Sequence, residues 1–402
     1  MKIFLGVVAC VFLLVSGCGS NSIYIGDTEL AEHDLKLILS NLPGTVMLTS
    51  AHESESVIKE GPKEYSNLVV VTKGRIRIAG KVFTNDKPVI ISIVTGEHFA
   101  PGESREIGTD YFVFLVPAHA GKHFEVMVSK HHPDWAGYFT RGGGSKPRGY
   151  SANTWKLLGY FHVSPQGKVL RNSVVTNANL HNPGPGVPLP GMVKVDDFAI
   201  DIYENSEING HCVSVFGRTP LTSITRDEAQ MLAKMNLKKL PTSRQWIMAC
   251  EPETYSQILS AKPKEGEGAH NIWTGQVAMT GFFASKHPDN LSSTGCVDMV
   301  GNVWEWCEEV IDFANVDTMP AKSSGYIVEV VKFIGIDCWP SVVSRSRPVG
   351  SQGYFAFDDS LGSAGIARGA SCSDGDKAGT ASLLINVARE QSSSKVGFRC
   401  TR

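Results

Sequence analysis

The chain has 402 residues, and its 38 Lys plus Arg nearly balance 40 Asp plus Glu. This length is sufficient for two or more domains. A nucleic-acid partner would require a clustered basic face, which the sequence lacks, so we expect none. After the N-terminal segment, no apolar run approaches the about 20 residues that a membrane-spanning helix needs. We therefore expect the mature chain to be soluble apart from any anchor.

The N-terminus carries an export signal. A short positive start precedes an apolar run from Ile3 to Val15, too short to span a bilayer and typical of a signal peptide over residues 1–17. The run ends in Val15-Ser16-Gly17-Cys18, which resembles the bacterial lipobox and predicts a lipid on Cys18. An ordinary signal peptide with an incidental cysteine is the alternative. Because Gly19 rather than Asp follows, the pattern resembles an outer-membrane address, and we expect a surface-exposed lipoprotein.

Cysteine spacing excludes one kind of site. Without Cys10 in the signal and Cys18 at the anchor, seven cysteines remain: Cys212, Cys250, Cys296, Cys307, Cys338, Cys372 and Cys400. Export permits disulfides, but an odd number leaves at least one thiol unpaired. No CxxC pair occurs, which argues against zinc. We expect neither a metal nor a cofactor.

The first half of the chain is predicted to contain a tether and a small β domain. Residues 18–62 are expected to form the tether, with one short helix near 30–39. Residues 63–132 contain short runs rich in Val, Ile and Phe, separated by Gly, Pro and Asp, which predicts a β-sandwich acting as a spacer. The runs are Asn67–Thr72, Arg75–Ile78, Pro88–Val94, Tyr111–Val116 and Phe124–Val128.

Residues 133–190 are expected to form a linker and the first strands of the next domain. Gly142-Gly143-Gly144 favours a flexible linker over a phosphate loop, because no strand, GK[ST] ending and helix surround it. Trp155 to Val163 is an aromatic-rich strand candidate. His162 lies within its alternating apolar pattern, so a structural histidine is favoured over a ligand or base.

Recognisable segments follow in the second half. Thr225 to Met235 is an amphipathic helix, with Ala229, Met231, Leu232 and Met235 near helical spacing. Thr242 or Ser243 can cap another helix, whose Trp246, Ile247 and Ala249 face inward. After the turn at Gly301-Asn302, Trp304 and Trp306 flank Glu305, and the two indoles should bury a large apolar area. The segments are Gly191–Glu204, Thr225–Met235, Leu240–Trp246, Asp298–Cys307, Arg368–Ser371 and Gly397–Cys400.

In this order and spacing, these segments resemble the formylglycine-generating, or sulfatase-modifying, enzyme family. The Gly301-Asn302-Val303-Trp304-Glu305-Trp306 element is its most specific part. The resemblance covers about residues 191–402 and implies an α+β chain with a C-type-lectin-like domain of the formylglycine-generating enzyme type, preceded by the small all-β domain. Fold alone does not give function.

The catalytic positions of that family can be checked here. The resemblance implies two reactive cysteines, three residues after the serine of an Arg-Gly-Gly-Ser element and five residues beyond the first. Asp374 and Gly379 occupy these places, whereas Cys372 directly follows Ser371. Because a two-thiolate copper site needs both cysteines, we expect no catalysis. Iron-dependent relatives need a three-histidine domain, and no matching histidine cluster lies upstream.

The C-terminal stretch suggests a different role. Ala381, Leu383, Ile385 and Val387 alternate with Ser382, Leu384 and Asn386, which predicts a strand with one core face and one solvent face. Arg368–Ser371, Ala378-Gly379 and Gly397–Cys400 resemble the framework of variable proteins of diversity-generating retroelements, in which reverse transcription rewrites chosen codons of a lectin-like domain. The resemblance implies a variable region over about 345–402. A solvated edge of a decayed enzyme domain is the alternative.

These patterns together predict a surface lipoprotein that binds a ligand without catalysis. We expect an unknown protein or glycan ligand on another cell or surface, and membrane contact through the lipid. A formylglycine-generating type oxidase and a structural envelope lipoprotein are the alternatives. Gln352–Phe357 could add aromatic contacts or form a buried loop. The expected contact residues are Cys372, Ser373, Asp374, Asp376, Lys377, Thr380, Ser382, Leu384, Asn386, Glu390 and Gln391.

Overall fold

The computed structural model of the chain describes two units. Its described residues are 24–25, 28–29, 58–60, 67–78, 80–118, 122–131, 155–176, 186–208, 210–250, 276–286, 290–315, 319–348, 351 and 353–402. The predicted signal peptide, the lipid site at Cys18, the helix near 30–39 and the triglycine lie outside these residues. Within them, no helix is both long and apolar enough to cross a membrane.

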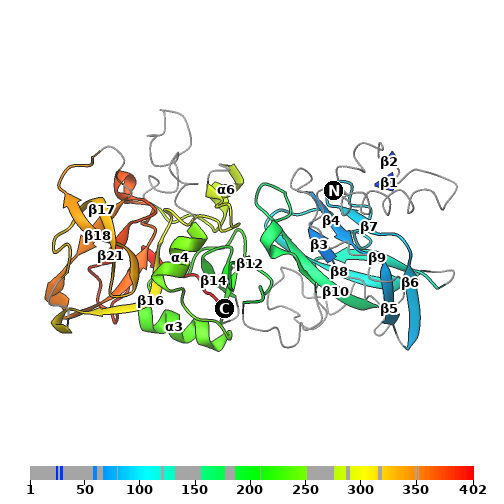
Figure 1. The fold of residues 1–402 in the computed structure, drawn as a ribbon, viewed down its shortest axis with the longest axis horizontal. Coiled ribbons are helices and arrows are strands. Elements are labelled where there is room, and N and C mark those ends of the chain that lie inside the picture. The colour runs from blue at the N-terminus through cyan, green and yellow to red at the C-terminus, as the bar shows by residue number, and fades with distance from the viewer. Residues whose placement is uncertain are drawn as a thin grey trace, which may run out of the picture.

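The first unit is built from β-strands, drawn in blue to green at one end of Figure 1. The expected runs form strands, joined by β6, which the sequence pattern did not predict. Its pairings are β1 with β2, β3–β4–β7, β5 with β6, and β11–β10–β8–β9. The bounds are β1 Tyr24–Ile25, β2 Thr28–Glu29, β3 Ile58–Glu60, β4 Leu68–Val71, β5 Gly74–Ile78, β6 Lys81–Asn85, β7 Val89–Ser92, β8 Thr109–Pro117, β9 Phe124–Ser129, β10 Lys156–Val163 and β11 Val175–Thr176.

Strand β10 belongs to the first unit rather than to the segment between the units. It pairs antiparallel with β8, with Tyr160 opposite Phe112, and β11 extends the same sheet. Phe161 is fully buried in one core cluster with Val113, because β10 is an inner strand covered on both sides. The sequence-based boundary near residue 132 is therefore too early, and the β unit extends to Thr176. A long-range pairing of this kind leaves no local signal.

Among its described residues, the second unit combines two β-hairpins, three α-helices and one large sheet. The sheet has seven strands in the order β18–β17–β19–β21–β20–β16–β22. Figure 1 shows β17, β18 and β21 at the end of the molecule that is remote from the β unit. The bounds are β12 Met192–Val195, β13 Phe198–Asp201, β14 Asn205–Ile208, β15 His211–Ser214, α3 Arg226–Met235, α4 Ser243–Cys250, α6 Phe282–Lys286, β16 Trp304–Asp312, β17 Gly325–Phe333, β18 Ile336–Ser344, β19 Tyr354–Phe357, β20 Ser363–Arg368, β21 Leu383–Ile385 and β22 Val396–Gly397.

Both longer helices begin where the sequence predicts. Thr225 caps α3 in a capping box, in which Glu228 N donates to the Thr225 hydroxyl and Thr225 N donates to the Glu228 carboxylate. Thr242 caps α4, since Gln245 N donates to its hydroxyl at 3.1 Å. The inward face of α3 differs from the prediction. Ala229 and Ala233 are buried, whereas Met231 and Met235 are exposed because α3 is a surface helix.

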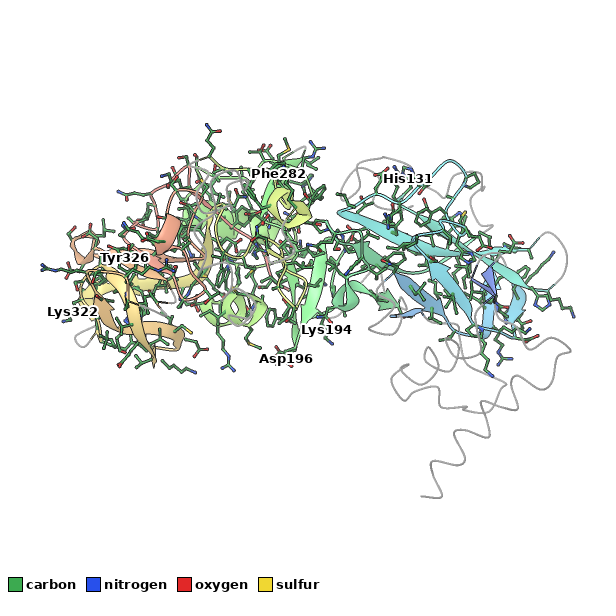
Figure 2. All side chains as sticks on the ribbon, turned by 90° about the horizontal axis from the view of Figure 1, so that it is seen from above. His131, Lys194, Asp196, Phe282, Lys322 and Tyr326 are labelled. Carbon is green, nitrogen blue, oxygen red and sulfur yellow. The ribbon has the colours of Figure 1, made fainter. Side chains whose placement is uncertain are left out.

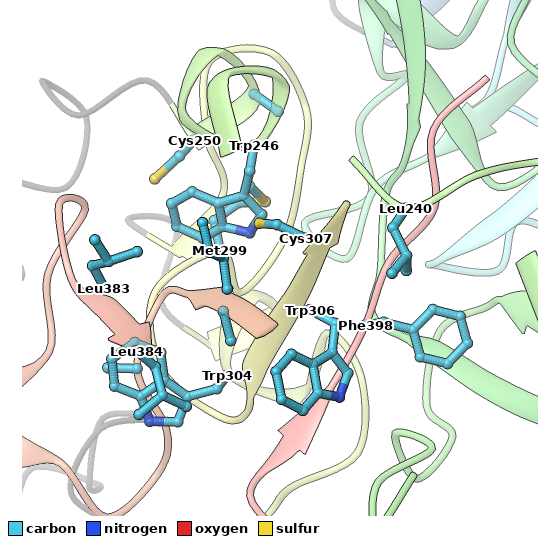
Figure 3. Close-up of a cluster of buried hydrophobic side chains, with 14 of the residues drawn as sticks. Leu240, Trp246, Cys250, Met299, Trp304, Trp306, Cys307, Leu383, Leu384 and Phe398 are labelled. Atoms are coloured by element: carbon cyan, nitrogen blue, oxygen red, sulfur yellow. The ribbon is translucent and has the colours of Figure 1, made fainter. Parts of the chain in front are cut away.

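The core of the second unit centres on the predicted Gly-Asn-Val-Trp-Glu-Trp element. Trp246 and Trp306 are fully buried, and Trp304 is nearly so. Figure 3 shows these three indoles in one cluster with Met299, Leu383 and Leu384 of β21, and Phe398, which follows β22. Glu305, between the two tryptophans, accepts hydrogen bonds from Trp246 Nε1 at 2.6 Å and from Arg399 Nη2 at 2.5 Å. The predicted tryptophan burial is therefore confirmed, and Glu305 links three distant segments.

A buried polar chain joins the two units. Asp110 on β8 contacts His162 Nδ1 at 2.9 Å, and His162 Nε2 contacts the Tyr203 hydroxyl at 2.9 Å. Gly191 N also donates to Asp110, at 3.2 Å. Both nitrogens of His162 are thus occupied and its side chain is buried. His162 is a structural histidine, as the sequence pattern favoured.

Candidate functional site

The predicted contact residues divide first by burial. Ser373, Lys377, Asn386, Glu390 and Gln391 are exposed, and Asp374 and Asp376 are half-buried. Four others are buried and cannot face a ligand: Cys372, Thr380, Ser382 and Leu384. The prediction of solvent exposure is wrong for these four.

For Ser382 and Leu384 the error has a physical cause in the position of β21. This strand lies between β19 and β20 inside the seven-stranded sheet, and Leu383, Leu384 and Ile385 are all buried. Alternation along a strand separates core from solvent only where one sheet face is open. Here both faces are covered, so Ser382 and Leu384 of the second set also pack in the core, whereas Asn386, after the strand, is exposed.

The exposed residues before β21 meet two tyrosines from distant strands. Tyr326 on β17 donates its hydroxyl to Asp376 Oδ2 at 3.2 Å, and its ring lies edge-on to Tyr354 of β19 at 5.4 Å. Lys377 Nζ lies 4.7 Å from the centre of the Tyr354 ring. We call Tyr326, Tyr354, Asp376 and Lys377 the tyrosine cluster. Figure 2 shows Tyr326 at the end of the second unit away from the β unit.

A buried serine holds the backbone beneath the tyrosine cluster. The Ser382 hydroxyl donates to Lys377 O at 3.0 Å and accepts from Tyr354 N at 3.2 Å. It therefore fixes the main chain at both positions without touching either side chain. Gly353 allows this approach, because a Cβ there would lie 2.2 Å from the Ser382 hydroxyl oxygen. Ser382 supports the surface rather than forming part of it.

Asp374 has a similar supporting role. Its Oδ2 accepts hydrogen bonds from Trp304 Nε1 at 2.9 Å, from Ser371 N at 2.7 Å and from the Ser371 hydroxyl at 2.5 Å. These bonds attach the loop after β20 to the first residue of β16. Asp374 also stands where the family resemblance places the first reactive cysteine. Since Gly379 occupies the second place, the site does not fit a two-thiolate copper centre.

Arg368 anchors the strand that leads into this loop. It is fully buried. Its guanidinium donates to the Ser243 hydroxyl at 2.9 Å, to Ala381 O at 3.1 Å and to Asp337 O at 2.7 Å. Arg368 thus ties β20 to α4, to the start of β21 and to β18. The Arg-Gly-Ala-Ser element is a framework, as the sequence indicated.

The exposed residues after β21 lie in another environment. Arg389 ion-pairs with Asp227 in the first turn of α3 at 2.9 Å, and Arg226 N donates to Arg389 O at 3.2 Å. Asn386, Glu390 and Gln391 therefore belong to the loop that crosses α3. The exposed contact residues are therefore divided between this loop and the tyrosine cluster, to which Asp376 and Lys377 belong.

Tyr326 is the member that sequence reasoning missed. It lies well before the expected variable region, and only the pairing of Tyr326 with Tyr354 across β17 and β19 brings it to the site. The two alternatives for the aromatic segment Gln352–Phe357 each hold for one residue: Tyr354 belongs to the tyrosine cluster, whereas Phe355 is fully buried. Burial and the neighbouring Asp376 carboxylate raise the pKa of Tyr326, so its hydroxyl remains a donor at neutral pH.

A pair of buried carboxyl groups lies beside the Gly-Asn turn. Glu204 accepts from Asn302 Nδ2 at 2.9 Å, and Asp298 accepts from Gly281 N at 2.9 Å. Burial, partly opposed by the Gly281 hydrogen bond, raises the pKa of Asp298 to about 7. Burial and the nearby Asp298 raise the pKa of Glu204 above its usual range. Across the described part of the chain, no three His, Cys, Asp or Glu side chains gather so as to hold a metal ion.

Comparison with known proteins relates the second unit to a family. Residues 203–402 match the family described as "Sulfatase-modifying factor enzyme 1-like domain". The C-terminal domain is similar to this family. A search of curated proteins found no match.

Solved structures share the fold over most of the chain. The Major Tropism Determinant I1 variant has a TM-score of 0.54 and 16% identity, covering 94% of this chain and 90% of that chain. The P3c variant covers the same shares at a TM-score of 0.53 and 16% identity. At this identity the likeness concerns the fold alone. With the family match, it confirms a C-type-lectin-like domain preceded by a small β unit.

Proposed function

We propose that this protein is a surface-displayed lipoprotein, anchored through Cys18, whose C-terminal domain binds a protein or glycan ligand without catalysis. The tyrosine cluster would form the centre of a diversified binding surface, together with Ser373. The observation that carries the proposal is the support by Ser382, whose hydroxyl holds the backbone at Tyr354 and Lys377. Both side chains can change while these main-chain bonds remain.

The chemistry of the cluster suits recognition of a macromolecule. Tyrosines supply apolar area and a polar tip at low conformational cost, which is why they are frequent in binding sites. Lys377 and Asp376 add one charge of each sign at the rim of the tyrosine pair. A few such side chains can dominate the affinity of an interface.

Two further observations support a binding role over an enzymatic one. Asp374 uses its carboxylate to hold Trp304 and Ser371, at a place where catalysis in the family would need a cysteine. The similar solved structures carry the names of several variants of one tropism determinant, so that fold persists among variants. A domain that displays changing side chains requires such a separation of framework and surface.

The DNA beside the gene tests diversification. We expect a near-copy of the codons for about residues 345–402 that differs only at adenines, and a neighbouring reverse transcriptase gene. The altered codons should include those for Tyr354, Ser373 and Lys377, and should spare those for Arg368 and Ser382. A locus without the near-copy would contradict the proposal. So would codon changes that affect buried and exposed positions equally.

Display and catalysis need separate measurements. Protease added to intact cells should digest the C-terminal domain; full protection would instead favour an envelope protein facing the periplasm. An aldehyde assay on a cysteine-containing sulfatase peptide, with copper present, should show no turnover. Turnover would establish the formylglycine-generating alternative.

A further inference from the structure

Two buried thiols meet where the start and the end of the C-terminal domain come together. Cys212 lies on β15 and Cys400 in the segment after β22, and residues 236–239 contact both segments: Asn236 Nδ2 donates to Cys212 Sγ at 2.8 Å, and Lys239 pairs with Thr401, next to Cys400. Each thiol is also close enough to shift the pKa of the other. Only 2% of Cys212 and 0% of Cys400 is exposed. The contact therefore joins positions almost a domain length apart in the sequence.

The main chain holds both positions in ordered structure. Cys212 pairs with Glu207 in the β14–β15 hairpin. Cys400 N donates to the Asp201 carboxylate at 2.8 Å, and Asp201 N donates to Cys400 O at 2.9 Å. The two sulfurs are thus brought together by the fold itself rather than by mobile side chains.

Polar groups around the sulfurs favour thiolate chemistry at Cys212. Asn236 Nδ2 donates to Cys212 Sγ at 2.8 Å, and Lys238 lies nearby in an ion pair with Asp201 at 2.6 Å. The hydrogen bond from Cys400, together with Lys238 and Asn236, lowers the pKa of Cys212 despite its burial. Burial raises the pKa of Cys400. In the docked domain the thiolate form is therefore more favoured at Cys212 than at Cys400.

We propose that Cys212 and Cys400 form a disulfide bond when the chain folds in an oxidising compartment. The Cys212 thiolate attacks an external disulfide, either oxidised glutathione or a thiol–disulfide exchange protein, and releases one thiol of that oxidant. Cys400, losing its proton, then attacks the Cys212 sulfur and releases the second thiol. Two electrons pass to the oxidant and one S–S bond forms in the chain. Because both sulfurs are buried in the folded domain, exchange takes place before the last strand docks.

The remaining thiols have different surroundings. Burial raises the pKa of both Cys250 and Cys296, and Cys296 adds to the shift at Cys250. Cys307 Sγ lies 3.8 Å from Glu305 O, and Cys372 Sγ lies 3.8 Å from the Ser373 hydroxyl. These residues and Cys338 are expected to stay as thiols. The bond would close a long loop around the whole lectin-like domain, which strongly restricts the unfolded chain.

Peptide mapping of the full chain tests the bond directly. One sample of purified protein is reduced, and a second is refolded with oxidised glutathione. Both are then unfolded in denaturant that contains an alkylating agent but no reductant, so that every free thiol is blocked. The oxidised sample should yield one linked pair of peptides, containing Cys212 and Cys400, with the other mature cysteines alkylated. Alkylation of both residues there, or linkage to a different cysteine, would overturn the proposal.

Thermal unfolding supplies a second readout. Reductant should lower the unfolding midpoint of the oxidised protein by roughly 5–10 °C. Cys212→Ser, Cys400→Ser and the double variant should share one lowered midpoint that reductant no longer changes. Cys338→Ser is the matched control and should retain the response. If reductant leaves the unfolding midpoint of the oxidised wild-type protein unchanged, the proposed disulfide is wrong. This result does not depend on whether a variant folds.

Discussion

The second unit contains two groups of polar side chains that differ in how they are held. Around Glu305, Arg399 is fully buried and every donor nitrogen of its guanidinium has a partner at 2.5 to 3.0 Å. In the tyrosine cluster, Lys377 is exposed and contacts a ring face. The group around Glu305 holds distant segments of the domain together. The tyrosine cluster projects from strands that other contacts already hold in place. Stability and recognition are therefore assigned to different residues of one domain.

The largest predicted effect breaks the first group. Arg399→Leu leaves the Glu305 carboxylate buried without its charged partner, and removal of one member of a buried pair costs about 3–5 kcal/mol. Urea unfolding followed by tryptophan fluorescence measures this loss. The matched control is Arg389→Leu, whose pair with Asp227 is 44% and 40% exposed, and which should change stability by about 0–1 kcal/mol. Equal effects would contradict the distinction.

The pH dependence of stability should report the buried carboxyl pair near this group. The pKa of Asp298 is about 7 in the folded protein, against about 4 in an unfolded chain. The folded state therefore binds the proton more tightly, and the unfolding free energy falls as pH rises through this window. Asp298→Asn should flatten that slope, with a residual part from Glu204. Unfolding curves between pH 5 and pH 8 that remain unchanged in the variant would contradict this assignment.

A single hydroxyl should separate framework from surface. Ser382→Ala removes two part-buried hydrogen bonds, from the Tyr354 N–H and to the Lys377 carbonyl, which costs about 1–3 kcal/mol. Ser373→Ala, at an exposed position, should change stability by less than about 0.5 kcal/mol. Denaturant midpoints of both variants test the comparison. If Ser382→Ala leaves the denaturant midpoint unchanged, the proposal that Ser382 supports the tyrosine cluster is wrong.

The smallest effect is predicted at the cluster itself. Lys377→Ala removes an exposed cation–ring contact, so the unfolding free energy should change by less than about 0.5 kcal/mol. Its backbone hydrogen bond to Asp374 O, at 3.0 Å, remains. Differential scanning calorimetry is sensitive enough to detect a larger change, which would mean that the side chain supports the fold.

The sequence predicts those features whose signals are local. The Gly-Asn-Val-Trp-Glu-Trp element and the capping residues of α3 and α4 lie where expected because neighbouring residues determine them. Three features depend on distant partners: the pairing of β10 with β8, the covering of both faces of β21, and the approach of Tyr326 to Tyr354. Alternation in residues 381–387 therefore predicted a strand but not its exposure.

The central claim is that the displayed side chains are independent of the fold beneath them. The most direct test is the unfolding free energy of a variant with Tyr326, Tyr354 and Lys377 all replaced by alanine. We predict a loss of about 1–2 kcal/mol, because the two tyrosines are half-buried and contact each other, which remains well below the effect of Arg399→Leu. A loss as large as that of Arg399→Leu would show that the cluster is part of the core framework, and would contradict the account.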